Sequence, residues 1–136
     1  MKTHELKLDI KYFDEVKSGK KNFEIRKNDR DFQVGDVLEL KAWDSSLLQY
    51  AFKKKDGKWH SYGRLADTIK AKILNVVSAD EYNNFQESVN GIPQSIKWAN
   101  SYQETYIRTI NEVLKDYFST DRLPNDYVIL GIEVVK

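Results

Sequence analysis

The chain contains no cysteine and only two histidines among its 136 residues. Without cysteine it can form neither a disulfide framework nor a thiolate metal site. Two histidines and no cysteine also argue against a metal centre built from protein ligands. We therefore expect no metal and no other cofactor.

Long apolar segments are lacking as well. The start Met-Lys-Thr-His has neither the apolar run of a signal peptide nor that of a transmembrane helix. We expect a cytoplasmic protein without membrane contact. The chain shows no internal repeat, low-complexity tract or linker, and its length suits one domain over residues 1–136 with a sizeable core.

Familiar catalytic signatures are missing. The sequence has no P-loop, dinucleotide fingerprint, H-E-x-x-H or G-x-S-x-G motif. Residues that support chemistry must therefore come from a less common pattern.

Charge is nearly balanced overall but uneven along the chain. The net charge is +1, yet residues 1–75 carry 17 Lys/Arg against 12 Asp/Glu and residues 76–136 carry 5 against 9. A polyanion would therefore contact the first part. Because the whole chain is close to neutral, such binding should be local and modest.

One stretch combines these charges with a strand pattern. Gly19-Lys20-Lys21-Asn22-Phe23-Glu24-Ile25-Arg26 reads as G-x-K-x-x-E-x-R and is followed by K-N-D-R and a V-G-D turn. Apolar and polar residues alternate, which predicts a strand from about Lys21 to Lys27 with Phe23 and Ile25 buried. Glu24 and Arg26 then share the opposite face.

The flanking residues predict a strand and a helix before the motif. The strand covers His4 to Leu8, and Asp9 can cap a helix whose apolar residues recur at three-residue spacing. Gly19 suits the left-handed position after that helix. In the turn that follows the motif we expect Gly35 to occupy a conformation costly for other residues.

The rest of the chain predicts strands followed by helices and a closing strand. We expect strands at 37–43 and 68–77, the latter interrupted at Asn75, a hairpin at 49–62 and a last strand at 127–135. Between them lies a helical segment at about 78–125, with capping boxes at Ser78 and Ser101 and an apolar stripe that includes Tyr102, Tyr106 and Tyr117. The fold class is α+β, a small, mostly antiparallel β pseudo-barrel with flanking helices.

The motif also resembles a known family. G-x-K-x-x-E-x-R with its E-I-R-K-N-D-R run is similar to the ASCH domains of the PUA-like superfamily, in particular an uncharacterised ASCH-related subgroup. The resemblance covers about residues 4–77 and 127–135. It implies a PUA-like pseudo-barrel in which the motif side chains line a cleft beside the barrel.

Lys21, Glu24 and Arg26 are the first candidates for a ligand site. Arg26 offers a donor fork for phosphate or carboxylate, Glu24 can accept hydrogen bonds or act as a base, and Lys21 adds a positive charge. The alternative is an exposed Glu24–Arg26 pair of little energetic weight beside a solvated lysine. The resemblance favours the ligand site.

Four further residues belong to the predicted neighbourhood of that site. Lys7 and His4 lie on the first strand, and Asn28 and Arg30 lie in the turn after the motif. A lone histidine is more often packed than catalytic, and turn residues usually serve backbone geometry.

A second basic surface is predicted at the hairpin. Its members are Lys54, Lys55, Lys58 and Trp59, with Lys53, His60, Tyr62 and Arg64 nearby. Cations and flat rings of this kind bind single-stranded nucleic acids. The alternative is a solvated edge hairpin whose lysines oppose aggregation.

Three functions fit these patterns. The first is an RNA-binding module that holds a nucleotide at Lys21, Glu24 and Arg26. The second is a small amidohydrolase, because some ASCH proteins hydrolyse an acylated cytosine nucleoside and share the lysine and arginine of the motif. Glu24 replaces the threonine of those enzymes, and neither Glu81 nor Glu87 can be assigned as their distant glutamate. The third is an accessory protein that binds a protein partner through the helical region. Whichever function applies, we expect a monomer or weak dimer.

Overall fold

The computed structural model describes residues 1–87, 103–120 and 122–135. The chain divides into two compact units. Unit 1 contains residues 1–23, 33–74 and 132–136, and unit 2 contains residues 24–32 and 75–131. The divisions fall within the strands β2 (Phe23–Lys27), β7 (Thr68–Ser78) and β8 (Tyr127–Val134), so each of these strands contributes to both units.

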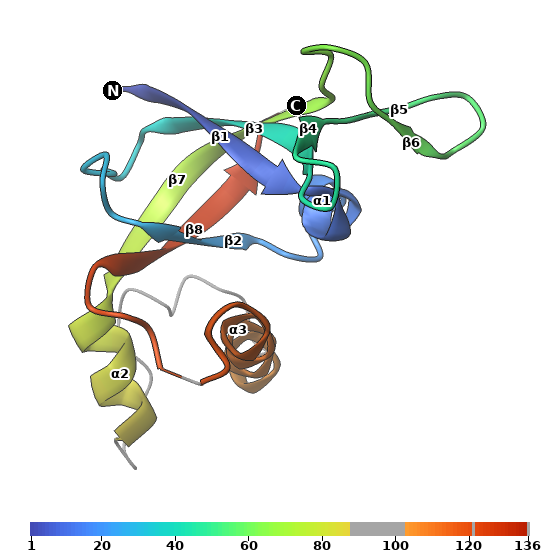
Figure 1. Cartoon of the computed structure of the whole chain (residues 1–136). Coiled ribbons are helices and arrows are strands. Elements are labelled where there is room, and N and C mark those ends of the chain that lie inside the picture. The colour runs from blue at the N-terminus through green and yellow to red at the C-terminus, as the bar shows by residue number, and fades with distance from the viewer. Residues whose placement is uncertain (88–102, 121, 136) are drawn as a thin grey trace. The chain divides into compact units, whose positions relative to one another are not determined.

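Unit 1 is built on a sheet in which alternate residues are buried. β1 (Thr3–Asp9) pairs in parallel with β3 (Val37–Asp44), and β3 pairs antiparallel with β7 and with the short β4 (Gln49–Tyr50). Figure 1 shows β1 alongside β3. The inner face of these strands carries the predicted apolar residues Leu6, Leu8, Leu38, Leu40, Ala42, Ile69, Ala71 and Ile73, all buried. The alternation in the sequence therefore becomes a core face and an outer face.

The helix before the motif forms where the sequence predicts it. α1 covers Ile10–Lys17, and the Asp9 carboxylate accepts a hydrogen bond from the Lys11 N–H at 2.9 Å, as a helix cap does. Gly19 has φ +84° and ends the helix, because a left-handed residue cannot continue it. The Lys21 N–H then donates to the Glu15 carbonyl at 3.0 Å, which returns the chain toward β2.

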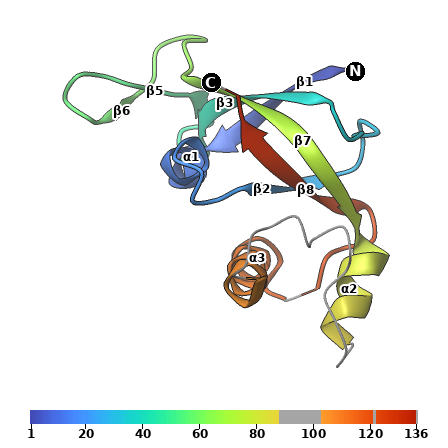
Figure 2. The same cartoon turned by 180° about the vertical axis from the view of Figure 1, so that it is seen from behind.

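The predicted hairpin is present but shorter than expected. β5 (Phe52–Lys53) pairs with β6 (Trp59–His60) around the turn that contains Gly57, whose φ is +76°. Tyr50, expected in an arm of the hairpin, instead pairs with Trp43 of β3. The hairpin extends from the sheet beside α1 in both views (Figures 1 and 2). Trp59 attaches the hairpin to α1: its ring packs edge-on against that of Phe13, with the ring centroids 5.2 Å apart.

Unit 2 combines strand segments with two helices. α2 (Ala79–Glu87) continues directly from the end of β7 (Figure 2), and the Ser78 hydroxyl caps it by accepting the Glu81 N–H at 3.1 Å. α3 covers Gln103–Phe118. Asn83 exchanges two hydrogen bonds with the backbone of Leu123, at 2.8 and 2.9 Å. The buried apolar residues of this unit include Ile25, Phe32, Val77, Tyr82, Ile110, Val113, Leu114, Leu123, Val128, Ile129 and Leu130.

The predicted fold class is confirmed. The chain is α+β, with a mostly antiparallel sheet in the strand order β1-β3-β7-β8-β2, consistent with a small pseudo-barrel. The closing strand β8 is central, as its continuous apolar run predicts. No helix in the described part of the chain is long and apolar enough to cross a membrane.

Two local predictions are wrong. β7 runs through Asn75 without interruption, because a polar residue on one face does not break a strand. Tyr117 is exposed, since the core side of α3 is provided by Ile110, Val113 and Leu114. Ser101 and Tyr102 lie outside the described residues.

Candidate functional site

The motif strand places two charged side chains in an unusual environment. Phe23 and Ile25 are buried as predicted, but Glu24, expected on the opposite and more polar face, is only 1% exposed. Its carboxylate oxygen Oε2 accepts hydrogen bonds from Arg26 Nε at 3.0 Å and Arg26 Nη2 at 2.9 Å. The Arg26 side chain retains 22% exposure. The Arg26 guanidinium is thus partly exposed and is hydrogen-bonded to a buried carboxylate.

Burial changes the energetic meaning of this pair. An exposed ion pair contributes little, whereas a buried carboxylate must be compensated by close, charge-assisted hydrogen bonds. Glu24 and Arg26 form the pair that the sequence suggested, but they form it inside the protein. Because strand neighbours two residues apart lie on the same face, the E-x-R spacing is what permits the contact.

Lys21 is the second buried charge of the motif. Lys21 is only 2% exposed, and its ammonium Nζ donates a hydrogen bond to the Phe23 carbonyl at 2.8 Å. The same ammonium is 4.6 Å from the centroid of the Phe23 ring and 5.1 Å from that of Tyr12. A carbonyl dipole and two ring faces therefore stabilise a cation that water does not reach.

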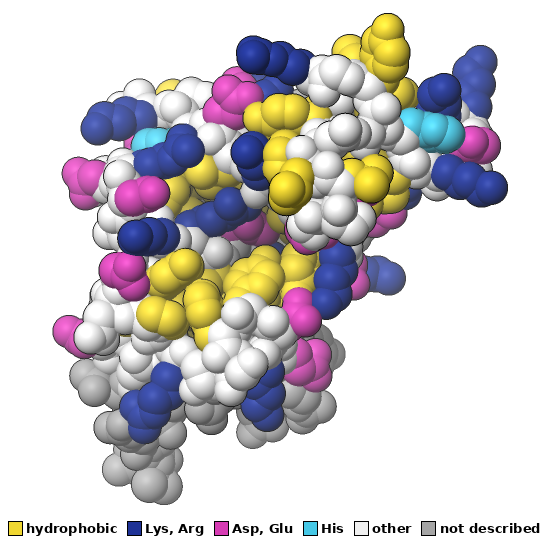
Figure 3. Space-filling view, viewed as in Figure 1, with side chains coloured by type: hydrophobic (Ala, Val, Ile, Leu, Met, Phe, Trp, Pro, Cys, Tyr) yellow, Lys and Arg dark blue, Asp and Glu magenta, His cyan; other side chains and the backbone are white. Residues whose placement is uncertain are grey.

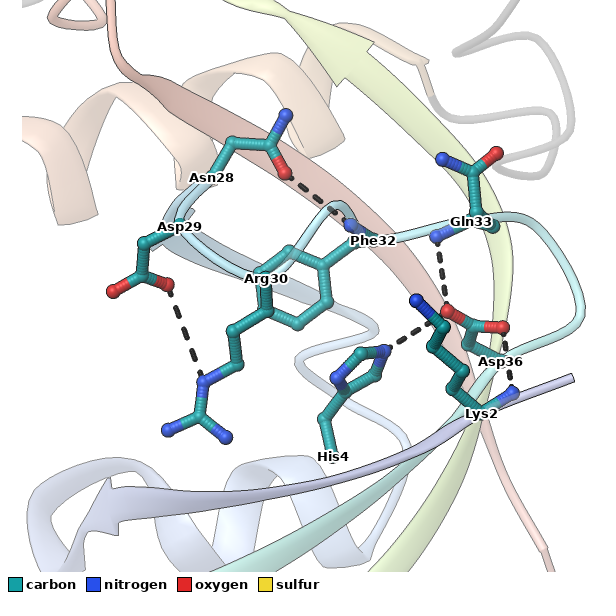
Figure 4. A network of polar contacts seen from close by, with 8 residues as sticks. All are labelled: Lys2, His4, Asn28, Asp29, Arg30, Phe32, Gln33 and Asp36. Atoms are coloured by element: carbon teal, nitrogen blue, oxygen red, sulfur yellow. Dashed lines mark hydrogen bonds and ion pairs between the residues drawn. The ribbon is translucent and has the colours of Figure 1, made fainter.

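A buried His4–Asp36 pair closes the turn after the motif, and the sequence alone did not reveal it. His4 Nε2 lies 2.9 Å from Asp36 Oδ2, and the backbone N–H groups of Lys2 and Gln33 donate to the same carboxylate at 3.0 and 3.1 Å (Figure 4). The hydrogen bond with His4, followed by that from Lys2, lowers the pKa of Asp36 from 3.8 to about 2. The available signals were the V-G-D turn and the alternation that puts His4 on the face of Leu6.

Asn28 and Arg30 behave as turn residues. The Asn28 side-chain oxygen accepts the Phe32 N–H at 3.3 Å, and Asp31 adopts φ +50°, so the turn chemistry predicted for this segment is confirmed. Arg30 Nε lies 4.0 Å from a carboxylate oxygen of Asp29 (Figure 4), and about half of its side chain is exposed.

Lys7 lies on the outer face of the sheet, opposite His4. The burial pattern of β1 alternates, with His4, Leu6 and Leu8 inward and Lys7 exposed. The Lys7 ammonium is 3.9 Å from the centroid of the Trp43 ring. The two first-strand candidates therefore point to different faces of one sheet.

The hairpin lysines Lys54, Lys55 and Lys58 are exposed, as the sequence suggested. Lysine side chains gather at the tip of the β5–β6 hairpin with an aspartate and a histidine (Figure 3). Trp59 is half-buried, because its ring packs on Phe13 and lies 5.2 Å from the ammonium of Lys53. One ring of the predicted stacking surface, that of Trp59, therefore helps to attach the hairpin to α1.

The described residues contain no group of three or more His, Cys, Asp or Glu side chains that could hold a metal ion. Their charged groups form pairs instead, among them the buried Glu24–Arg26 and His4–Asp36 pairs. The arrangement can hold a hydrogen-bonding ligand at Arg26.

Comparison with known proteins gives a family match, a similar phage protein and two similar solved structures. A protein of Escherichia phage P2, "Uncharacterized 12.9 kDa protein in GpA 3'region", is 55% identical over 73 residues, which are 54% of this chain. The match spans 65% of that protein's length.

Two solved structures also align with this chain. "Crystal structure of hypothetical protein PH0355" aligns with TM-score 0.46 and 19% identity over 98% of this chain and 99% of that one. The solution NMR structure of Protein PF0455 from Pyrococcus furiosus aligns with TM-score 0.41 and 18% identity over 98% of both chains. Residues 3–59 match the family described as "Domain of unknown function (DUF3850)", and the whole G-x-K-x-x-E-x-R motif lies within that match.

Proposed function

We propose that this protein is a nucleic-acid-binding module that takes RNA and contacts a nucleotide through the motif residues Lys21, Glu24 and Arg26. The observation that carries the proposal is the Glu24–Arg26 pair. A carboxylate that is 1% exposed holds a guanidinium that keeps 22% exposure, through contacts of 3.0 and 2.9 Å.

The physical argument is preorganisation. A free arginine loses side-chain entropy when it binds a ligand, whereas one already fixed by a carboxylate loses less. The planar guanidinium suits phosphate oxygens and the acceptor edges of bases. The similarity of the motif to ASCH domains supports a nucleotide as the ligand class, and the basic first part of the chain supports a polyanion.

The test is a titration of short single-stranded RNAs against wild type and two motif variants at two salt concentrations. Arg26→Ala should weaken binding by about 1.5–3 kcal/mol through loss of a charge-assisted hydrogen bond. Glu24→Gln should keep measurable affinity, because the amide oxygen can still accept from Arg26.

Arg122→Ala is the matched control for these variants. Arg122 is an exposed arginine that belongs to no predicted site, so its removal should change affinity little. Equal losses in Arg26→Ala and Arg122→Ala would point to unspecific charge effects and contradict a defined site.

A second function, hydrolysis of an acylated cytosine nucleoside, is favoured by the burial of Lys21 and Glu24. Charged groups that are 2% and 1% exposed are costly, and such groups are common where a base or acid is needed. In that function Glu24 acts as the base, so Glu24→Gln should lower turnover by ~10²-fold or more while substrate still binds. A hydrolysis screen of acylated cytidines, run beside the RNA titration, separates the two functions.

A further inference from the structure

The outer face of the unit 1 sheet collects lysines from three strands. The register places Lys7 of β1 beside Lys41 of β3, and Lys41 beside Thr68 of β7. Lys70 and Lys72 lie further along β7 on the same face, opposite Glu39 and Val37. Neighbouring residues in paired strands share a face, while the alternate residues are buried. These lysines are far apart in the sequence and meet only through strand pairing.

Two aromatic rings lie at one end of this face. Trp43 of β3 pairs with Tyr50 of β4, and their rings meet edge to face at 5.1 Å and 82°. The Lys7 ammonium lies 3.9 Å from the Trp43 centroid and 5.9 Å from that of Tyr50. Both aromatic residues are half-buried, so the protein fixes the rings and leaves part of each accessible. We name Lys7, Lys41, Trp43, Tyr50, Lys70 and Lys72 the basic-aromatic face.

The charge of this face favours a polyanion. Its four lysines outnumber the three carboxylates on the same face, those of Glu5, Asp9 and Glu39. The register pairs Asp9 with Trp43, and Glu5 is 3.9 Å from the Lys41 ammonium. Lys70 and Lys72 are exposed, on rows of the sheet without aromatic residues. Phosphates can therefore approach at β7, and flat groups at the Trp43 end. At ~3.3 Å per residue, the six steps from Val37 to Trp43 span about 20 Å, enough for several nucleotides.

We propose that the basic-aromatic face binds single-stranded nucleic acid, with bases stacked at Trp43 and Tyr50 and phosphates at Lys70 and Lys72. Unpaired bases are required, because the rings offer their faces only to a base that is not stacked within a duplex. The Lys7 ammonium now covers the Trp43 ring, and a base replaces it there while Lys7 turns to a phosphate. This exchange is favourable, because base stacking on an aromatic ring stabilises more than an exposed cation–π contact.

This inference deepens the proposed function, since it assigns a second surface to the same class of ligand. It depends on different residues, however. Trp43, Lys70 and Lys72 belong to the face of the sheet, whereas the proposed function depends on Arg26 of β2. The two can therefore fail separately.

The experiment measures fluorescence anisotropy of labelled 12-mers of uridylate and of thymidylate, titrated with the full chain at about 50 and about 200 mM salt. Trp43→Ala should weaken binding of both by about fivefold or more, whereas Trp43→Tyr, which keeps a ring, should stay within about threefold of wild type. Lys70→Ala with Lys72→Ala should lower the slope of log affinity against log salt by about 1.4, because each single-strand phosphate contact contributes ~0.7.

The control is Lys11→Ala with Lys17→Ala, which removes the same charge from exposed positions on α1. A larger effect at Lys70 and Lys72 than at this control supports the proposal. Because Lys70 and Lys72 are exposed, that variant should fold even if Trp43→Ala does not, and circular dichroism checks both.

The outcomes separate the two proposed sites, the basic-aromatic face and the motif site. Binding lost in the Trp43 and Lys70/Lys72 variants but kept in Arg26→Ala supports the face and overturns the motif site. Binding lost only in Arg26→Ala overturns the face and keeps the motif site. Absence of binding to both oligonucleotides at low salt overturns both. Preference for uridylate or thymidylate tells whether RNA or DNA is the ligand.

Discussion

The motif strand and the β5–β6 hairpin use charge in opposite ways. The hairpin gathers Lys54, Lys55 and Lys58 close together in sequence, and all three are exposed. The motif has fewer charges, separated by apolar residues, and Lys21 and Glu24 are 2% and 1% exposed. A cluster of charged residues in the sequence therefore does not show which charged side chains are buried in the folded protein.

The reason lies in the partners that each segment provides. The hairpin lysines Lys54, Lys55 and Lys58 are all exposed and therefore keep their hydration. In β2 the two-residue spacing gives Glu24 the Arg26 guanidinium, and Lys21 finds the Phe23 carbonyl at 2.8 Å. Burial of a charge is tolerated only with such hydrogen bonds, so these residues should be the more sensitive to substitution.

Glu24→Ala should give the largest effect. It removes the carboxylate that pairs with the Arg26 guanidinium, and removal of one partner of a buried pair costs about 3–5 kcal/mol. Because Arg26 keeps 22% exposure and water can reach it, we expect about 3 kcal/mol, measured by urea denaturation. Glu39→Ala, at a half-exposed position on β3, is the control and should cost clearly less. Equal costs would mean that burial makes no difference between the two glutamates.

Gly35→Val should come next. Gly35 has φ +94°, as the sequence predicted, and a Cβ there would meet no atom within 4 Å. The cost is therefore backbone strain and not a clash, roughly 1–3 kcal/mol in unfolding free energy. Gly57→Val at the hairpin tip, with φ +76°, tests whether strain alone sets the value. An unchanged melting temperature for Gly35→Val would contradict the argument.

Asp36 should make stability depend on pH in the acid range. Its pKa in the folded chain, about 2, is below the ordinary 3.8, so the ionised carboxylate stabilises the fold above about pH 4. That contribution is lost as pH falls from about 4 to about 2. Asp36→Asn should therefore be less stable at neutral pH and show a flatter acid profile than wild type. Denaturation midpoints measured stepwise down to pH 2 would give parallel profiles if Asp36 were not involved.

Lys54→Ala with Lys55→Ala should give the smallest effect on stability. Both side chains are exposed, and surface substitutions of this kind usually change unfolding free energy by no more than about 0.5 kcal/mol. If these lysines contact RNA phosphates, the pair should flatten the salt dependence of binding by about 1.4 in slope. A loss of stability comparable to that of Glu24→Ala would remove the distinction between the two regions.

Much of the fold could be predicted because its signals are local. Asp9 caps α1, Gly19 ends it, and the alternation in β1, β3 and β7 assigns the correct residues to the core. The hairpin turn at Gly57 follows from Asp-Gly chemistry. These features depend on a few neighbouring residues, so the sequence is sufficient for them.

The candidate site was predicted less completely, because burial and partners of charged residues depend on distant segments. The E-x-R spacing showed that Glu24 and Arg26 share a face, but an exposed pair has the same spacing. The contact of His4 with Asp36 joins residues 32 positions apart, and Trp43 meets Lys7 through the parallel pairing of β1 and β3. No local pattern specifies such contacts.

The sequence by itself therefore determined the order of elements, their buried faces and the motif that places Lys21, Glu24 and Arg26 on one segment. Only the tertiary structure decided that Lys21 and Glu24 are enclosed while the hairpin lysines are exposed, and that Lys7, Trp43 and Lys70 share one sheet face. The physical reason is that side-chain direction follows from local backbone geometry, whereas removal of a charge from water requires chain segments brought together by folding.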